Sequence, residues 1–117
     1  MILENFGYLM FTHFMADFAF QSDFMSKYKY KLPYVMAVHC FIWTFALYAM
    51  SDLLSISVPA ELWAPMFTVH AITDWDKCRR IDKKYNNDYQ KYEKEIKRLF
   101  HIDQAIHFGQ VLLISLF

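Results

Sequence analysis

The chain has 117 residues, 56% of them hydrophobic and 20% aromatic, and its formal net charge is zero. A soluble domain of this length cannot bury so much apolar surface, so we expect one integral membrane domain over residues 1–117. The zero net charge hides a segregation, because all twelve Lys and Arg residues lie within residues 27–31 or 77–98. Two glycines are too few for a glycine-rich phosphate loop and no nucleic-acid-binding motif occurs, so nucleic acid is not an expected partner.

Four apolar stretches lie around the two basic blocks, and a membrane-spanning helix needs about 20 residues. They cover residues 2–24, 33–54, 60–75 and 99–117. The third is short and is interrupted by Pro65, so we expect its helix to take residues from the flanking segments. The first is not expected to be a signal peptide, because it lacks a basic start and holds His13 and Asp17 in its middle. The pattern predicts an all-α, integral membrane four-helix bundle.

The loops between these stretches predict the topology. Residues 25–32 carry three Lys and residues 76–98 carry nine basic residues, whereas residues 55–59 carry none. Loops rich in Lys and Arg remain in the cytoplasm. We therefore expect the first and third loops to face the cytoplasm and both termini to lie outside the inner (plasma) membrane, with the lipid bilayer surrounding the spans.

The third loop, residues 76–98, has a helical pattern of its own. Apolar or aromatic side chains recur three or four residues apart at Ile81, Tyr85, Tyr89, Tyr92, Ile96 and Leu99. This spacing predicts a cytoplasmic amphipathic helix between the third and fourth spans, weakened where Asn86 and Asn87 occur. The helix either lies on the membrane or extends the last span; alternatively, its basic face docks an anionic lipid or a nucleotide.

Ionisable and amide side chains occur inside the predicted spans, many of them four residues apart. They are His13, Asp17 and Gln21, then His39, then His70, Asp74 and Lys77, then Asp103, Gln104, His107 and Gln110. Residues four apart share a helix face. An Asp at the centre of a span costs about 2.5–3.5 kcal/mol, so such residues persist where they face inward and find partners. Their presence predicts a functional site inside the bundle.

The predicted depths of these residues agree across the four spans. Each His and Asp of the set falls in the cytoplasmic half of its span, given a rise of about 1.5 Å per residue. Nitrogen and oxygen donors on facing helices are the usual ligands of metal centres in bundles, and they suit Zn²⁺, Mn²⁺, Fe²⁺ or Ni²⁺. We therefore expect one or two divalent transition-metal ions, bound by His13, Asp17, His39, His70, Asp74, Asp103 and His107.

Neighbouring amide and basic side chains complete the expected site. Gln21, Gln104 and Gln110 would orient the metal ligands through hydrogen bonds. Lys77 would bind an anionic substrate oxygen, such as that of a phosphate, because a protonated ammonium has no lone pair to offer a metal.

The order of these motifs along the chain resembles a known family. The stretch from His13 to Lys27, His-x-x-x-Asp-x-x-x-Gln-x-Asp-x-x-x-Lys, looks like the opening motif of the domain of unknown function 3307 family. The motifs around His39, His70 and Asp103 follow in the same order as in that family of small bacterial and phage membrane proteins. The resemblance covers nearly the whole chain and implies a membrane fold with a polar site. The His and Asp layout is also loosely similar to that of membrane-bound metal-dependent hydrolases.

The leading functional hypothesis is a metal-dependent hydrolase acting on a phosphoester or lipid head group at the cytoplasmic face. Whichever of Asp17, Asp74 and Asp103 is free of metal would act as general base. One alternative is an ion or proton path, disfavoured because no ionisable His, Asp, Glu or Lys continues through residues 42–50 or 111–117. Another is a structural or inhibitory protein whose His and Asp residues form a metal-free network. Anionic lipid, a phosphorylated small molecule and a second copy of the chain stay open as partners.

Overall fold

The computed structural model describes residues 2–19 and 21–117, and over this part the chain is all-α. The elements are α1 (Ile2–Phe14), the π-helix η1 (Met15–Ala19), α2 (Asp23–Tyr28), α3 (Pro33–Leu53), the 3₁₀ helix η2 (Ala60–Leu62), α4 (Trp63–Lys83) and α5 (Glu93–Ser115). No strand occurs among the described residues. The predicted all-α class is therefore confirmed.

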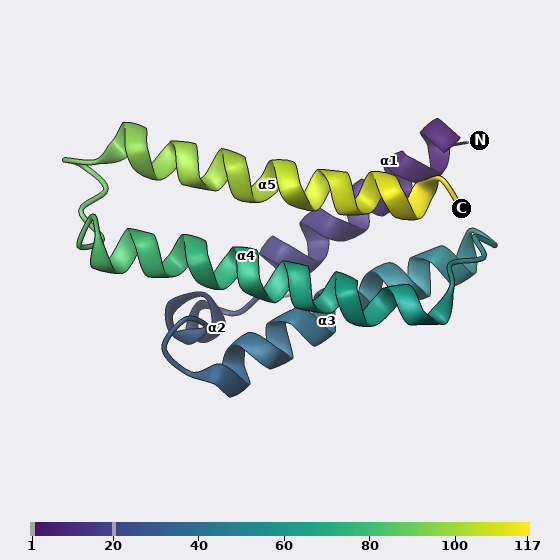
Figure 1. The fold of residues 1–117 in the computed structure, drawn as a ribbon, viewed down its shortest axis with the longest axis horizontal. Helices are drawn as coiled ribbons and strands as arrows, with labels where there is room; N and C mark the ends of the chain where they lie inside the picture. The colour runs from purple at the N-terminus through teal and green to yellow at the C-terminus, as the bar shows by residue number, and fades with distance from the viewer. Residues whose placement is uncertain (1, 20) are drawn as a thin grey trace.

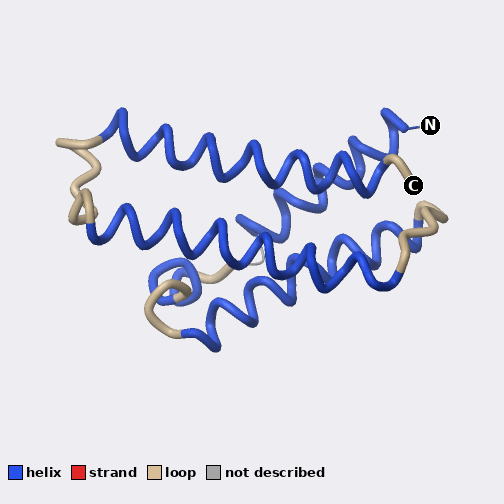
Figure 2. The backbone as a smooth tube through the Cα atoms, in the orientation of Figure 1, coloured by secondary structure: helices blue, strands red, loops and turns tan. Residues whose placement is uncertain are grey.

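The helices α1, α3, α4 and α5 pack as a bundle. Both α1 and α4 pack against α3 and α5. Figure 1 shows the two termini near the α3–α4 connection at one end, and α2 near the α4–α5 turn at the opposite end. Figure 2 shows the same two connections as loops at opposite ends of the molecule. The first and third loops thus lie at one end of the bundle, an arrangement that the topology prediction requires.

Two prolines lie at helix starts. Pro33 is the first residue of α3, and Pro65 lies in the first turn of α4. Proline is tolerated there because the N–H groups of the first turn have no partner within the helix. Pro65 therefore does not interrupt the helix of the third apolar stretch, contrary to the expectation. That helix does extend beyond residue 75, because α4 continues to Lys83.

The basic segment 76–98 is not one separate helix, which corrects that expectation, although its last part extends the fourth apolar helix, the alternative that the sequence left open. Its first part continues α4 to Lys83, and its last part begins α5 at Glu93. Between them, Asn86 and Asn87 have positive φ angles of 52° and 55°, a conformation that ends a helix and that Asn adopts more readily than most residues. Ile81 and Ile96 of the predicted apolar stripe are buried in the molecule.

The first predicted span also ends before residue 24. The π-helical turn η1 follows α1 directly, and α2 begins a new helix at Asp23, where the Ser22 hydroxyl accepts a hydrogen bond from the Met25 N–H. Residue 20 lies outside the described residues. Single π-helical turns are frequent at functional sites, and this one carries Asp17.

The interior of the bundle holds both polar and apolar side chains, and many large apolar side chains are exposed on its surface. The apolar core is formed by fully buried residues from α1, α3 and α5, namely Leu9, Trp43, Leu47, Val111 and Ile114. Large apolar side chains are exposed on every bundle helix, among them Phe11, Phe41, Ile72 and Leu112. Of the helices described, α3 is the one long and apolar enough to cross a membrane, a test that the core helix of a soluble protein also passes.

Candidate metal centre

Seven His and Asp side chains meet in the interior of the bundle. They are His13 of α1, Asp17 of η1, His39 of α3, His70 and Asp74 of α4, and Asp103 and His107 of α5. None of them is more than 8% exposed. The structure thus brings together every residue that the sequence predicted as a metal ligand, and we call this set the interior cluster.

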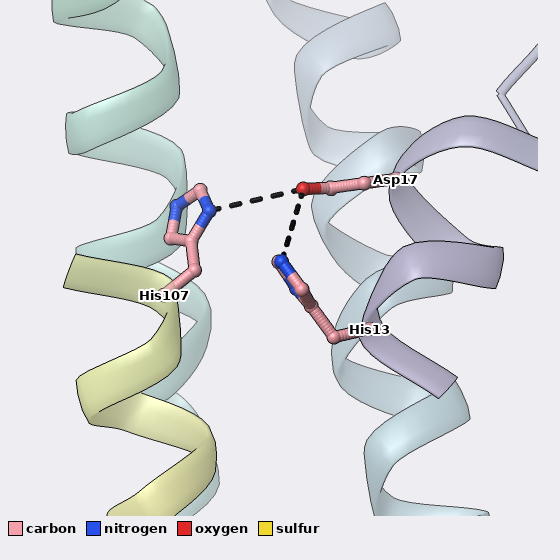
Figure 3. A group of neighbouring side chains, drawn as sticks. All are labelled: His13, Asp17 and His107. Carbon is pink, nitrogen blue, oxygen red and sulfur yellow. Dashed lines mark ion pairs between the residues drawn. The ribbon is translucent and has the colours of Figure 1, made fainter. Parts of the chain in front are cut away.

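Asp17 lies at the centre of the interior cluster. Its Oδ1 atom is 3.5 Å from His39 Nε2 and 3.6 Å from His70 Nε2. Its Oδ2 atom is 3.7 Å from His13 Nε2 and 3.8 Å from His107 Nδ1, the group drawn in Figure 3. None of these four contacts is a hydrogen bond, and Oδ1 has no hydrogen-bond partner among the described residues. The carboxylate therefore has two sides, which we call the Oδ1 face and the Oδ2 face.

The Oδ1 face has the dimensions of a metal site. The two imidazole nitrogens of His39 and His70 are 3.1 Å apart, and they are 3.5 and 3.6 Å from Asp17 Oδ1. Three atoms at these separations share a point about 2.0 Å from each, which matches typical Zn–N and Zn–O bond lengths. Nitrogen and oxygen donors also suit Mn²⁺, Fe²⁺ and Ni²⁺. The residues of this face therefore fit a divalent ion.

Packing orients the two imidazoles of the Oδ1 face. Their Nδ1 atoms have no hydrogen-bond partner among the described residues, whereas metal-bound histidines usually donate the second nitrogen to an acceptor. The indole ring of Trp43 stacks on the His70 ring instead, with a centroid distance of 4.1 Å and an interplanar angle of 15°. His39 Nε2 also lies 3.1 Å from Asp74 Oδ2 and from His70 Nε2, so one of these two nitrogens carries a hydrogen when no metal is bound. Metal binding would move that hydrogen to an Nδ1 atom, since neither Nδ1 has a partner among the described residues.

The other two carboxylates of the cluster are neutralised by lysine. Lys29 Nζ lies 2.7 Å from Asp74 Oδ2, and Lys77 Nζ lies 3.1 Å from both Asp74 Oδ1 and Asp103 Oδ2. Within the part of the chain that the structure describes, no Lys or Arg nitrogen comes within 4.0 Å of Asp17. A buried carboxylate needs a compensating cation. Asp17 is therefore the carboxylate of the interior cluster whose charge still needs a compensating cation.

Lys77, which was expected to bind an anionic substrate oxygen, is buried. Burial alone would lower the pKa of its ammonium, but the carboxylates of Asp74 and Asp103 outweigh that effect and hold the pKa above its ordinary value. Lys77 therefore stays charged and bonded to carboxylates of the chain itself.

A pocket of about 540 Å³ opens beside the cluster, at the end of the bundle that holds α2 and the α4–α5 turn. Its lining includes Asp17, Gln21, Lys29, Lys77 and Gln104, together with Lys27 and Lys31. The lining also holds Asp23 and Asp82, and Lys29 and Lys77 are paired with Asp74 and Asp103, so Lys27 and Lys31 are the lysines of this surface left to attract an anionic group. The pocket therefore gives such a group access to Asp17.

The three glutamines differ in position. Gln104 meets the expectation, because its Oε1 lies 2.9 Å from His13 Nε2 and its amide nitrogen lies near two carboxylates of the cluster. Gln21 instead accepts a hydrogen bond from Lys29 at 3.0 Å. Gln110 donates to the backbone carbonyl of Met66 and so links α5 to α4.

Sequence reasoning missed three residues that shape the cluster. Trp43 donates its indole N–H to His13 Nδ1 at 2.8 Å, and Thr73 Oγ1 lies 3.1 Å from His107 Nε2. Both could have been found, because each follows a histidine of its own helix by three or four residues and shares its face. Lys29 carries no such signal, because it belongs to a basic loop whose charges were explained by topology.

Comparison with known proteins gives one match. The model of a family described as a protein of unknown function, DUF3307, matches residues 6–117. No curated protein and no solved structure matches the chain. Because the match covers nearly the whole sequence, from α1 through α5, the chain belongs to the DUF3307 family.

Proposed function

We propose that this chain is an integral membrane protein that binds a divalent transition-metal ion at Asp17. We further propose that it uses this ion to hydrolyse a phosphoester or lipid head group at the cytoplasmic face. The observation that carries the proposal is the state of Asp17, a buried carboxylate that has four histidines but no Lys or Arg beside it among the described residues. Its Oδ1 atom points between two imidazole nitrogens and lacks a hydrogen-bond partner in the part of the chain that the structure describes.

The distribution of side chains supports a bundle with four spans in a membrane. Exposed aromatic and aliphatic residues on α1, α3, α4 and α5 would favour aggregation in water but suit contact with lipid tails. The ionisable residues face inward, where intramembrane charges find partners. The basic loops lie at one end, which is consistent with a cytoplasmic orientation of that end.

Each part of the site has a role in this proposal. Asp17, His39 and His70 would hold the ion, which supplies Lewis acidity to activate water and polarise a phosphoryl oxygen. The lysines of the pocket would hold the anionic part of the substrate. Asp103 Oδ1, which has no hydrogen-bond partner among the described residues, would accept the proton of the attacking water.

One observation weighs against each alternative function. A metal-free polar network would leave Asp17 without a lysine partner, although the cluster supplies lysines for Asp74 and Asp103. An ion or proton path would have to cross the layer formed by Leu9, Leu47 and Val111, whose side chains are fully buried and apolar.

Asp17→Asn tests the proposal, with Asp52→Asn as control, since Asn has the shape of Asp but no charge and Asp52 is exposed at the far end. Zn²⁺ at 100 times its Kd should stabilise the wild type and the control by about 2.7 kcal/mol in thermal unfolding in mild detergent. It should not stabilise Asp17→Asn. Absence of any response of the wild type to Zn²⁺, Mn²⁺, Fe²⁺ and Ni²⁺ would contradict the metal site.

The hydrolytic step needs a separate measurement. Metal-loaded wild type should release inorganic phosphate from phosphatidic acid or from p-nitrophenyl phosphate in mixed micelles, and Asp17→Asn should not. Binding of the ion without release of phosphate from either compound would contradict the hydrolase proposal and leave the metal site standing.

A further inference from the structure

Trp43 of α3 determines which nitrogen of His13 carries a proton. The indole Nε1 of Trp43 lies 2.8 Å from His13 Nδ1, and both side chains are fully buried. An indole N–H is a donor only, so His13 Nδ1 must accept and cannot itself carry a hydrogen. In the neutral imidazole the hydrogen is then on Nε2.

The Nε2 hydrogen of His13 has an acceptor in place. Gln104 Oε1 lies 2.9 Å from it. The same amide then presents its NH₂ group to Asp17 Oδ2 at 3.5 Å and to Asp103 Oδ2 at 3.4 Å. The hydrogen bonds therefore run in one direction, from Trp43 through His13 and Gln104 to the carboxylates.

The direction of these hydrogen bonds limits the number of metal ligands on the Oδ2 face of Asp17. Figure 3 shows His13 and His107 on either side of the Asp17 carboxylate, an arrangement that looks like three metal ligands. His13 Nε2, however, carries a hydrogen and has no lone pair for a metal. Two donors remain on this face, His107 Nδ1 and Asp17 Oδ2, and they are 3.8 Å apart.

His107, like His13, carries its hydrogen on Nε2. The Thr73 hydroxyl has one hydrogen and lies 2.8 Å from the backbone oxygen of Val69, so it donates there. Its oxygen can then accept from His107 Nε2 at 3.1 Å, which leaves His107 Nδ1 without a hydrogen. Nδ1 faces Asp17 Oδ2 but has no third ligand beside it.

We infer that the centre holds a single metal ion, on the Oδ1 face, and that Trp43 closes the Oδ2 face to a second ion by fixing His13. This inference rests on the proposed metal site. Trp43, His13 and Gln104 are then positioning residues. They place the Gln104 amide nitrogen 3.5 Å from Asp17 Oδ2 and leave Oδ1 for the ion.

The tautomer can be measured without any metal. Nitrogen NMR of the full chain with ¹⁵N-labelled histidine in detergent should show His13 in the Nε2–H form, its signals being identified among those of the other histidines by their loss in His13→Asn. Trp43→Phe, which keeps an aromatic ring against His70 but removes the donor, should convert this histidine to a mixture of tautomers. A hydrogen on Nδ1 of His13 in the wild type, or an unchanged tautomer in Trp43→Phe, would overturn the role of Trp43.

Metal stoichiometry tests the single ion. Titration of the wild type with Co²⁺, followed by its visible absorption, should saturate at one ion per chain. His13→Asn keeps an acceptor for the Trp43 N–H and should retain that ion with its spectrum unchanged, whereas His39→Asn should lose it. Saturation at two ions, or equal loss in His13→Asn and His39→Asn, would overturn the inference. A wild type that binds no Co²⁺ would instead count against the proposed function, and the nitrogen spectra would still decide the role of Trp43.

Discussion

Lys29→Met removes a buried cation from the interior cluster while keeping most of the volume of the side chain. The ammonium of Lys29 is 2.7 Å from Asp74 Oδ2 and 3.0 Å from Gln21 Oε1, and the residue is 7% exposed. Removing one partner of a buried ion pair costs roughly 3–5 kcal/mol. Because Lys77 still compensates Asp74 through Oδ1, we expect the lower end of that range, about 3 kcal/mol.

Thermal unfolding followed by circular dichroism in mild detergent would measure this loss. For a chain of this size, about 3 kcal/mol corresponds to a fall in Tm of roughly 10 °C. Lys31→Met, an exposed lysine in the same basic block, is the matched control and should change stability by no more than about 0.5 kcal/mol.

A second change separates the ion pair from packing. In Lys29→Met with Asp74→Asn, the charge left unpaired by the first substitution is gone, so part of the lost stability should return. If Lys29→Met and Lys31→Met have equal effects, the buried ion pair between Lys29 and Asp74 does not exist. The argument that Asp17 differs from Asp74 in lacking a lysine would then fail.

Three further outcomes are expected. Lys77→Met should destabilise the protein by roughly 3–5 kcal/mol in the same unfolding assay, while the exposed Lys83→Met should stay within about 0.5 kcal/mol; similar effects would contradict the burial of Lys77. Cysteines placed at the exposed positions Lys31 and Asn87 should both react with an impermeant maleimide from the cytoplasmic side, and labelling of either from outside would refute the proposed topology. Gln110→Leu should leave the metal content unchanged, because that amide binds a backbone carbonyl; loss of metal would assign it a place in the site.

The interior cluster could be predicted because helical spacing is a local property. Residues such as His70 and Asp74 share a face whatever the rest of the fold does, and the cost of burying them requires inward orientation. The two basic loops, placed on the same side of the membrane, then predicted the direction of each helix and so the depth of its polar residues. Local pattern and topology together were enough to assemble all seven side chains.

Pairings across the bundle could not be predicted in the same way. The sequence contains no signal that Lys29, eight residues beyond Gln21, returns to Asp74 on another helix. The π-helical turn at Asp17 depends on packing and was not visible either. In the segment 76–98, the apolar spacing was correctly detected, but the positive φ angles at Asn86 and Asn87 divide it between α4 and α5.

The metal content of the purified chain tests the central claim most directly. Elemental analysis of protein purified in mild detergent without chelator should give close to one transition-metal ion per chain for the wild type and for Asp52→Asn. Asp17→Asn, folded to the same helix content, should carry none, because the only buried carboxylate without a lysine partner in the described chain has lost its charge. Equal metal content in wild type and Asp17→Asn, or none in either, would contradict a metal centre at Asp17.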